Sequence, residues 1–272
     1  MEGNTVLYET EGSVAKVTLN RPKYRNAQSY ELLDALDAAL DRAVADDEIK
    51  VVILRGAGGN FSSGHNLGTP EQLALREERG IPTDGIGFYE NFRHYNLDIT
   101  VKWRNLPKPT IAMVEGFCIF GGWMIAASMD LVFASSEALF LPALLEYYSV
   151  PYDIGPKKAK ELLFESRFLT ANEACDLGFV NRIYAPDDLE RETMLYAQRV
   201  SEQTHSALRM AKLSTNKAQD LMGYSNSVEA AFADYLVMMN IRGTGRAEGN
   251  DRRLTGVDLA LKGLRKERPG LA

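Results

Sequence analysis

Short runs of β-branched and other apolar residues that alternate with helical patterns are the feature that most constrains this fold. Val51–Leu54 is one such run and is broken by Gly56. Thr110–Val114 is a second, and it is followed by an apolar helical stretch at Gly121–Met129 and a third run at Leu131–Ala134. Strands that are apolar on both faces are typical of a sheet covered by helices. The sequence therefore predicts an α/β fold with a buried sheet.

The N-terminal segment predicts a hairpin followed by a helix. Thr5–Thr10 and Val14–Leu19 alternate apolar and polar residues on either side of Gly12, which is typical of two antiparallel strands. Ser29 is placed to cap a helix whose apolar residues recur at helical spacing. These residues are Leu32, Leu33, Leu36, Ala39, Leu40 and Val44. The strand–strand–helix–strand order partly recurs later in the chain, without a sequence repeat of fixed period.

Two further regions surround this core pattern. Glu71–Leu106 begins charged, is loosened by glycine and proline, and ends in an aromatic helical stretch. Its aromatics either face a substrate, as in a lid, or pack a helix on the core. From Pro186 onward we expect helices at Asp187–Gln203, Ala207–Met222, Val228–Ile241 and Leu254–Leu264, with a turn at Gly243–Asp251. We divide the chain into a core, residues 1–203, and a C-terminal helical oligomerisation region, residues 204–272, which packs on its own core or on a neighbouring subunit.

Composition excludes several classes of function. The 272 residues carry a net charge of −6 and no basic patch, which argues against a nucleic-acid partner. The apolar stretches are too short to span a bilayer, and Met1–Thr10 lacks the apolar core of a signal peptide. Cys118 and Cys175 have no metal-ligand spacing, and the three histidines form no pair at helical spacing. We expect a cytoplasmic protein without a metal site or a membrane partner.

Two glycine-bearing turns carry the candidate chemistry. Asn60–Leu67 follows the Val51–Leu54 strand, and Gly116–Met124 follows the Thr110–Val114 strand and opens a helix. Each turn places free backbone N–H groups at a strand end, and the second adds the positive end of a helix dipole. Two such groups that converge form an oxyanion hole. Taken alone, each turn is weak evidence, because glycine after a strand usually marks only an ordinary turn.

Four longer segments carry a family resemblance. They are NRPKYRNAQSYELLDAL (20–36), VVILRGAGGNFSSGHNL (51–67), KPTIAMVEGFCIFGGWMIAASMDLVFAS (108–135) and LTANEACDLGFVNRIYAPDDL (169–189). In this order they resemble the signature segments of the crotonase (enoyl-CoA hydratase/isomerase) superfamily along nearly the whole chain. The resemblance implies a spiral of ββα units with a C-terminal helical trimerisation region, in a homotrimer or dimer of trimers. It also implies a coenzyme A thioester as substrate, with no separate cofactor.

The resemblance assigns roles to residues of both turns. The backbone N–H groups of His65 and Gly121 would form the oxyanion hole, and the His65 imidazole would be a polar neighbour of the ligand rather than a general base. The residues implied to bind coenzyme A are Ser63, His65, Asn66 and Leu67, with Lys23 or Arg25 near its phosphates.

The chain departs from the family at both catalytic carboxylates. Hydratases of the family use two glutamates, but one position is Met124 and the other is Leu144, or Ala143 in an alternative alignment. Ordinary two-glutamate hydration is therefore not expected. Asp153 and Glu146 are the candidate catalytic residues that remain nearby.

Each remaining carboxylate has a structural alternative. Asp153 could instead cap a helix that begins near Gly155. Glu146 could be a partly exposed glutamate paired with Lys157 or Lys158.

The predicted acyl pocket is rich in large side chains. The chain is shorter than the family between Pro151 and Lys157, which would reshape the pocket floor. The residues expected there are Trp123, Met124, Leu144, Tyr148 and Tyr152, with Tyr147 nearby. They would suit a bulky or cyclic acyl group, although core packing explains the aromatics almost as well.

The expected function is acyl-CoA processing through an enolate-type oxyanion. The reaction could be that of a hydratase-like lyase or of an isomerase. One alternative is a carbon–carbon hydrolase of cyclic β-diketones or their coenzyme A esters. The other is a non-catalytic acyl-CoA-binding homologue.

Overall fold

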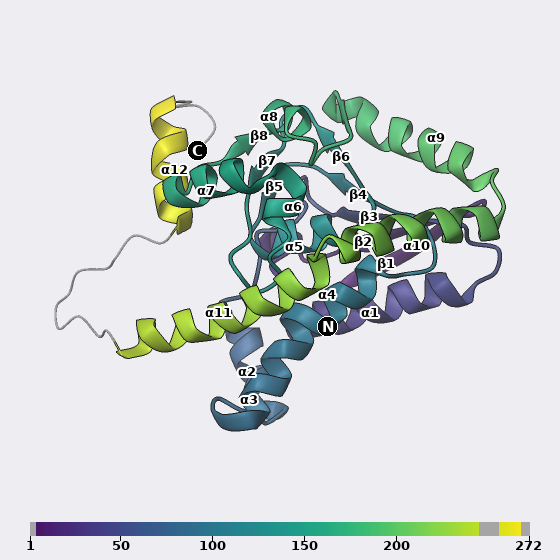
Figure 1. Ribbon diagram of the computed structural model, residues 1–272. Helices are drawn as coiled ribbons and strands as arrows, with labels where there is room; N and C mark the ends of the chain where they lie inside the picture. The colour runs from purple at the N-terminus through teal and green to yellow at the C-terminus, as the bar shows by residue number, and fades with distance from the viewer. Residues whose placement is uncertain (1–3, 245–255, 268–272) are drawn as a thin grey trace.

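The computed structural model describes residues 4–244 and 256–267 and contains two sheets flanked by helices (Figure 1). The strands are β1 (Val6–Glu11), β2 (Val14–Leu19), β3 (Val51–Gly56), β4 (Thr110–Val114), β5 (Phe117–Ile119), β6 (Leu131–Ser135), β7 (Leu139–Leu141), β8 (Leu169–Thr170) and β9 (Arg182–Tyr184). The larger sheet has the order β1-β2-β3-β4-β6-β9, and the smaller has the order β5-β7-β8. The predicted α/β class is confirmed.

Helices connect and cover these strands. They are α1 (Tyr30–Ala45), α2 (Pro70–Glu78), α3 (Gly85–Arg93), α4 (Ile99–Arg104), α5 (Gly121–Ser128), α6 (Val150–Ile154), α7 (Pro156–Glu165), α8 (Ala171–Asp176), α9 (Leu189–Ser201), α10 (His205–Leu221), α11 (Tyr224–Thr244) and α12 (Gly256–Glu267). Short 3₁₀ turns lie at Pro22–Tyr24 and Pro186–Asp188, and one π-helical turn lies at His94–Asp98.

The large sheet is parallel except at its first strand. β1 and β2 form the predicted antiparallel hairpin, and β2, β3, β4, β6 and β9 pair in parallel. Parallel neighbours require crossover connections, which α1 and the later helices supply. The Ser29 hydroxyl accepts a hydrogen bond from Leu32 N at 3.2 Å, so the predicted cap of α1 is confirmed.

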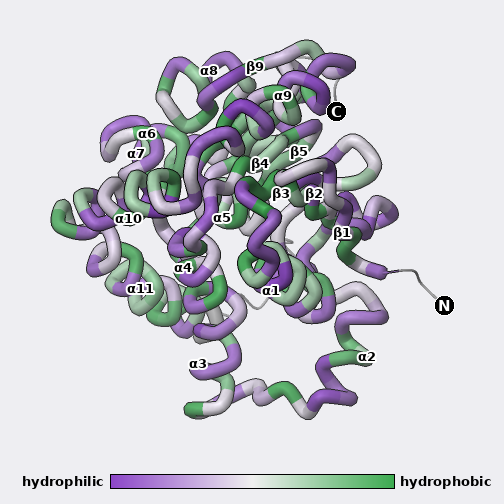
Figure 2. The backbone as a smooth tube through the Cα atoms, turned by 90° about the vertical axis from the view of Figure 1, so that its right-hand side faces the viewer, coloured by the Kyte–Doolittle hydropathy of each residue, from purple (hydrophilic) through white to green (hydrophobic). Residues whose placement is uncertain are grey.

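Both faces of the sheet are covered, as the apolar strand sequences predict. Val51 and Ile53 pack with α9 on one face, whereas Val52 and Leu54 belong to the main core, which includes α1, on the other. Side chains alternate between the faces of a strand, so each strand must be apolar throughout. Figure 2 shows these strands as a hydrophobic centre, with α2 and α3 projecting from the body of the molecule.

The aromatic stretch before β4 packs against the C-terminal helices. Phe92 of α3 stacks on Phe232 and Tyr235 of α11, with ring centroids 5.9 and 5.8 Å apart. Arg93 bonds Glu229 with both terminal guanidinium nitrogens, at 2.8 and 2.6 Å. The packing alternative therefore holds for these rings, and α11 contacts α3 of the same chain.

The C-terminal helices occur where the sequence predicts them. Gly243 and Thr244 end α11, and the remainder of the predicted 243–251 turn lies outside the described residues. α12 places Ala260 and Leu264 against Ile119 and Phe168 of the small-sheet region. None of the helices that the structure describes combines the length and apolar character needed to cross a bilayer.

A buried ion pair joins α10 to the large sheet. Lys212 lies 2.8 Å from Asp130, with side chains 6% and 24% exposed. The same Asp130 Oδ2 accepts hydrogen bonds from the Thr110 amide and hydroxyl at 2.8 and 3.0 Å. Because Lys212 is so well buried, its charge depends on this partner.

We expect Asp130→Ala to lower the free energy of unfolding by about 3 kcal/mol, because it leaves the Lys212 charge buried and unpaired. Urea denaturation followed by circular dichroism measures this loss. The double variant Asp130→Ala/Lys212→Met should recover part of it, since the unpaired charge is gone. A single variant that is as stable as the wild type would show that the pair does not hold α10.

Candidate active site

The loop that connects β2 to α1 is fixed by one buried asparagine. Asn26 is fully buried, and its side-chain oxygen accepts a hydrogen bond from the Arg21 amide at 2.9 Å. Its side-chain nitrogen donates to the carbonyls of Ala57 and Asn60 at 2.9 and 2.7 Å. One side chain therefore ties the 21–26 loop to the turn that follows β3.

Two serines continue this connection toward His65. The Ser62 hydroxyl donates to the Asn26 carbonyl at 2.9 Å and accepts from the Gly64 amide at 3.2 Å. The Ser63 amide donates to the Arg25 carbonyl at 2.9 Å, and its hydroxyl donates to the Tyr24 carbonyl at 3.1 Å. The turn at 62–65 is thus held at several points and has little freedom to shift.

The backbone N–H group of His65 points away from Gln28, the residue with which His65 pairs. Gln28 N donates to Gly64 O at 2.8 Å, and Asn66 N donates to Gln28 O at 2.9 Å, in a parallel bridge between Gln28 and His65. These two bonds flank His65, so its own N–H and C=O point to the opposite side. Within the described residues, the His65 amide donates to no other group.

The second turn brings Gly121 to the same place. Phe120 adopts φ 45° and ψ −102°, and its amide donates to Leu141 O at 3.0 Å. Gly121 then begins α5, where the first amides of a helix have no intrahelical acceptor. A Cβ atom on Gly64 would lie 3.2 Å from Gly121 N, so the two turns are in direct contact.

The close approach requires glycine on both sides. A Cβ atom on Gly121 would meet the Gln28 side-chain oxygen at 2.5 Å, and one on Gly64 would meet Ile119 O at 2.8 Å. Among the described residues neither the His65 nor the Gly121 amide has an acceptor, and the two amides lie at touching turns beside a helix N-terminus. That they donate to one oxygen, as in an oxyanion hole, stays a prediction.

Glu146 lies in the electrostatic environment of His65. The side chain is buried at 6% exposure, and Lys158 pairs with Glu161 instead. The alternative of a partly exposed glutamate paired with that lysine is therefore wrong. Burial lowers the pKa of the His65 imidazole, and the Glu146 carboxylate opposes this by raising it.

Asp153 lies within α6 and binds α5. Its Oδ2 accepts hydrogen bonds from the Trp123 indole at 2.9 Å and the Ser149 hydroxyl at 2.6 Å. The cap of α7 is Gly155, with no side-chain cap bond, so the alternative that Asp153 caps that helix is wrong. Burial raises the pKa of the Asp153 carboxyl to about 6, against the lowering effect of its two donors.

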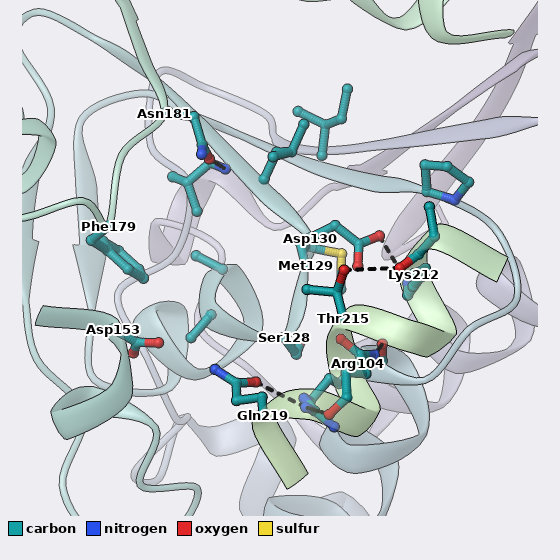
Figure 3. A pocket seen from close by; sticks show the side chains of 18 of the residues that line it. Arg104, Ser128, Met129, Asp130, Asp153, Phe179, Asn181, Lys212, Thr215 and Gln219 are labelled. Atoms are coloured by element: carbon teal, nitrogen blue, oxygen red, sulfur yellow. Dashed lines mark hydrogen bonds and ion pairs between the residues drawn. The ribbon is translucent and has the colours of Figure 1, made fainter. Parts of the chain in front are cut away.

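The Asp153 carboxylate faces a cavity of about 650 Å³ beside α10 (Figure 3). Lys212, paired with Asp130, and Arg104, bonded to Gln219 at 2.8 Å, lie on the far side from Asp153. The wall also includes the C-terminal end of α5, which is about 12 Å from its N-terminus by the rise per residue. No local sequence pattern predicts this cavity, because its charged groups come from segments far apart in the chain.

The predicted coenzyme A residues gather around the first turn. Arg25 lies over the Phe117 ring at 5.5 Å, and Lys23 lies over the Tyr24 ring at 4.9 Å. Asn66 uses its side chain internally, bonding the Thr69 amide and hydroxyl at 2.9 Å each. Leu67 is 96% exposed. Two positively charged side chains and one exposed apolar side chain therefore lie close to the turn at residues 62–65.

The predicted acyl-pocket residues separate into three groups. Trp123 and Met124 are buried in the core, and Trp123 stacks on Phe179 with ring centroids 3.8 Å apart. Tyr152 lines the cavity and packs edge-on against Tyr224 at 5.0 Å. Leu144 and Tyr148 are half-buried in the segment that carries Glu146. Their contact with an acyl group stays a prediction.

No cluster of metal ligands accompanies these groups. Among residues 4–244 and 256–267, no three His, Cys, Asp or Glu side chains are placed to hold a metal ion together.

Known proteins resemble this chain over most of its length. The family model described as enoyl-CoA hydratase/isomerase matches residues 9–235. EchA13 of Mycobacterium tuberculosis is 36% identical over 248 residues, covering 84% of this chain and 78% of that protein. A short-chain-enoyl-CoA hydratase of Clostridium acetobutylicum is 32% identical, covering 80% of this chain and 83% of its own. A solved structure of a probable enoyl-CoA hydratase from Mycobacterium smegmatis is 39% identical with a TM-score of 0.77, covering 84% and 91%.

Gly64→Ala tests the contact between the two turns. The new Cβ would push Gly121 away, so we expect the rate of acyl-CoA turnover to fall by about 100-fold or more. Gly59→Ala is the matched control, because Gly59 also has a positive φ, 71°, but no atom within 4 Å of its Cβ position. Both should lose roughly 1–3 kcal/mol of stability from backbone strain. Equal activity in the two variants would contradict the proposed geometry.

The raised pKa of Asp153 predicts a pH-dependent stability. The unfolded carboxyl titrates near 3.8 and the folded one near 6, so the folded protein keeps a proton that the unfolded chain has lost between these values. This contribution is full below about pH 4 and is lost as the pH rises through 6. The unfolding free energy of the wild type minus that of Asp153→Asn should therefore fall by about 2–3 kcal/mol from pH 4 to pH 7.

Urea denaturation at a series of pH values provides the measurement. Asp84→Asn, at an exposed position, is the control and should show no such trend. A flat difference for Asp153→Asn would mean that its carboxyl is not desolvated.

Proposed function

The chain belongs to the enoyl-CoA hydratase/isomerase family, and from this premise we propose that it processes acyl-CoA thioesters through an enolate-type oxyanion. The observation that carries the proposal is the contact between two turns whose amides, at His65 and Gly121, have no acceptor among the described residues. A thioester oxygen bound there would receive two hydrogen bonds. As negative charge develops on the oxygen, these bonds strengthen and lower the barrier.

The coenzyme A moiety would lie along the loop beside the first turn. Arg25 and Lys23 supply positive charge suited to phosphate groups, and Ser63 fixes their loop to the oxyanion turn through the Tyr24 carbonyl. Leu67 offers an exposed apolar contact for the pantetheine arm. Together these groups support the coenzyme A assignment.

Glu146 and Asp153 are the carboxylates that we propose to support proton transfer. Glu146 acts at the oxyanion side, where its charge influences His65. Asp153 has a pKa of about 6, which suits a group that exchanges a proton near neutral pH, and it contacts α5 through Trp123. Met124 is buried and cannot carry a proton, so a water held between two glutamates is not supported.

The proposed acyl group is bulky or cyclic. Leu144 and Tyr148 flank Glu146 in a half-buried segment, where apolar surface would be removed from water by such a group.

Substrate and reaction type can be tested together. The pure protein is incubated with crotonyl-CoA, 3-enoyl-CoA, cyclic acyl-CoA esters and a cyclic β-diketone, and the products are identified by mass spectrometry. A gain of one water with an intact carbon chain indicates hydration, no change in mass indicates a double-bond shift, and ring opening indicates carbon–carbon hydrolysis. If coenzyme A esters bind but none reacts, the protein is an acyl-CoA-binding homologue and the proposal fails.

Glu146→Gln should lower kcat for the accepted substrate by about 100-fold or more, because it removes a charge that supports proton transfer. KM should change little, since the amides and the coenzyme A loop are untouched. Glu137→Gln removes an exposed carboxylate outside the site and is the matched control. Steady-state kinetics distinguishes the two, and equal kcat values would exclude Glu146 from the reaction.

A further inference from the structure

The His65 side chain holds a buried polar atom without a partner. Its Nε2 makes no hydrogen bond to the described protein. Buried polar atoms are almost always paired, because an unsatisfied one costs about 1–3 kcal/mol. The fold keeps this cost at the oxyanion turn, where the nitrogen has no partner among the described residues.

The Glu146 carboxylate also lacks a hydrogen-bond partner among the described residues. Glu146 is 6% exposed, and its side chain takes part in no hydrogen bond or ion pair with the residues that the structure describes. It is also the charged group that acts on the His65 imidazole. A negative charge that acts on an imidazole favours its protonated form, because the two charges then compensate each other.

Covalent geometry keeps the imidazole near the oxyanion hole. The Nε2 atom of a histidine lies roughly 5 Å from the amide nitrogen of the same residue. A thioester oxygen bound about 3 Å from that amide therefore brings the carbon next to its carbonyl into the neighbourhood of the ring. No other side chain is tied to the oxyanion site by so few bonds.

We propose that the His65 imidazole is a catalytic residue that transfers protons to and from the acyl chain. This inference rests on the proposed function. The neutral ring takes a proton from the carbon beside the thioester carbonyl. The C–H electron pair forms the enolate double bond, and the carbonyl oxygen, now negative, accepts hydrogen bonds from the His65 and Gly121 amides.

The return step balances the reaction. The imidazolium either trades its proton with water and returns one to the same carbon, which exchanges hydrogen, or gives the proton to the far end of a conjugated enolate, which shifts a double bond. Burial lowers the pKa of the imidazole, so the ring is neutral and able to accept a proton near neutral pH. The Glu146 carboxylate stabilises the imidazolium between the two steps.

In this proposal His65 performs the proton transfer that two glutamates perform in hydratases of the family. Met124 and Leu144 occupy their positions, and the Asp153 carboxylate faces the cavity beside α10 (Figure 3). His65 is therefore the titratable side chain that belongs to the oxyanion turn itself.

Hydrogen exchange into butyryl-CoA tests the proposal. The wild type, His65→Ala, His65→Gln and the exposed control His205→Ala are incubated with butyryl-CoA in D₂O, and loss of the signal of the hydrogens beside the carbonyl is followed by NMR. Binding of butyryl-CoA is measured by calorimetry. We expect both His65 variants to bind within about 3-fold of the wild type, because their amide remains, and to exchange at least 100-fold more slowly. Added imidazole should restore part of the rate in His65→Ala.

The outcomes separate this inference from the proposed function. Exchange within about 3-fold of the wild type in both His65 variants overturns the catalytic role alone. A wild type that neither binds nor exchanges butyryl-CoA overturns the proposed function and this inference with it.

An NMR titration of the His65 ring tests the pairing with Glu146 directly. Glu146→Gln should lower the pKa of His65 further, since the carboxylate raises it. An unchanged pKa would remove Glu146 from the pair.

Discussion

The contact between the 62–65 turn and the first turn of α5 is the constraint on which the candidate site depends. Two backbones approach there with no side chain between them, and glycine is the residue that permits it. Such an approach needs support from both sides. Asn26 and Ser62 hold one turn through buried hydrogen bonds, and β5 and α5 hold the other. The segment at residues 20–27, which contains Asn26, is thus part of the site through the support that it gives to the turn.

A strained residue completes this contact. Phe120 has a positive φ, which costs a residue other than glycine roughly 1–3 kcal/mol. Its amide bonds Leu141 O, its carbonyl accepts from Met124 N, and its ring packs against the cluster that includes Leu264 of α12. The backbone conformation of Phe120 sets the direction of the next amide, that of Gly121. Packing against the cluster that includes Leu264 of α12 helps to hold this conformation. The C-terminal region therefore supports the site through packing, whatever it does between subunits.

Much of the fold could be predicted, because its signals are local. The runs that became β3, β4 and β6 are apolar on both faces, and the Ser29 cap and the hairpin at Gly12 follow from short-range chemistry. The two glycine turns were also visible. The surroundings of Asp153 and Glu146 were not, because burial and hydrogen-bond partners arise from segments far apart in the chain. Ser149 and Trp123, which bind Asp153, lie 4 and 30 residues away from it. The lysine proposed as a partner of Glu146 binds Glu161 instead.

If Met124 and Leu144 stand where the resemblance implies two glutamates, the proposed site differs in its electrostatics as well as in its proton carriers. Two ionised carboxylates near an oxyanion would raise its energy, whereas Met124 and Leu144 add no charge and lower the local polarity. Hydrogen bonds from fixed amides are stronger in such surroundings because fewer mobile dipoles compete with them. The proposed site would therefore be better suited to holding an enolate than to activating a water molecule. A reaction that removes one proton from the acyl chain and returns one to it needs only a single proton carrier. The proposed arrangement favours a reaction of this kind.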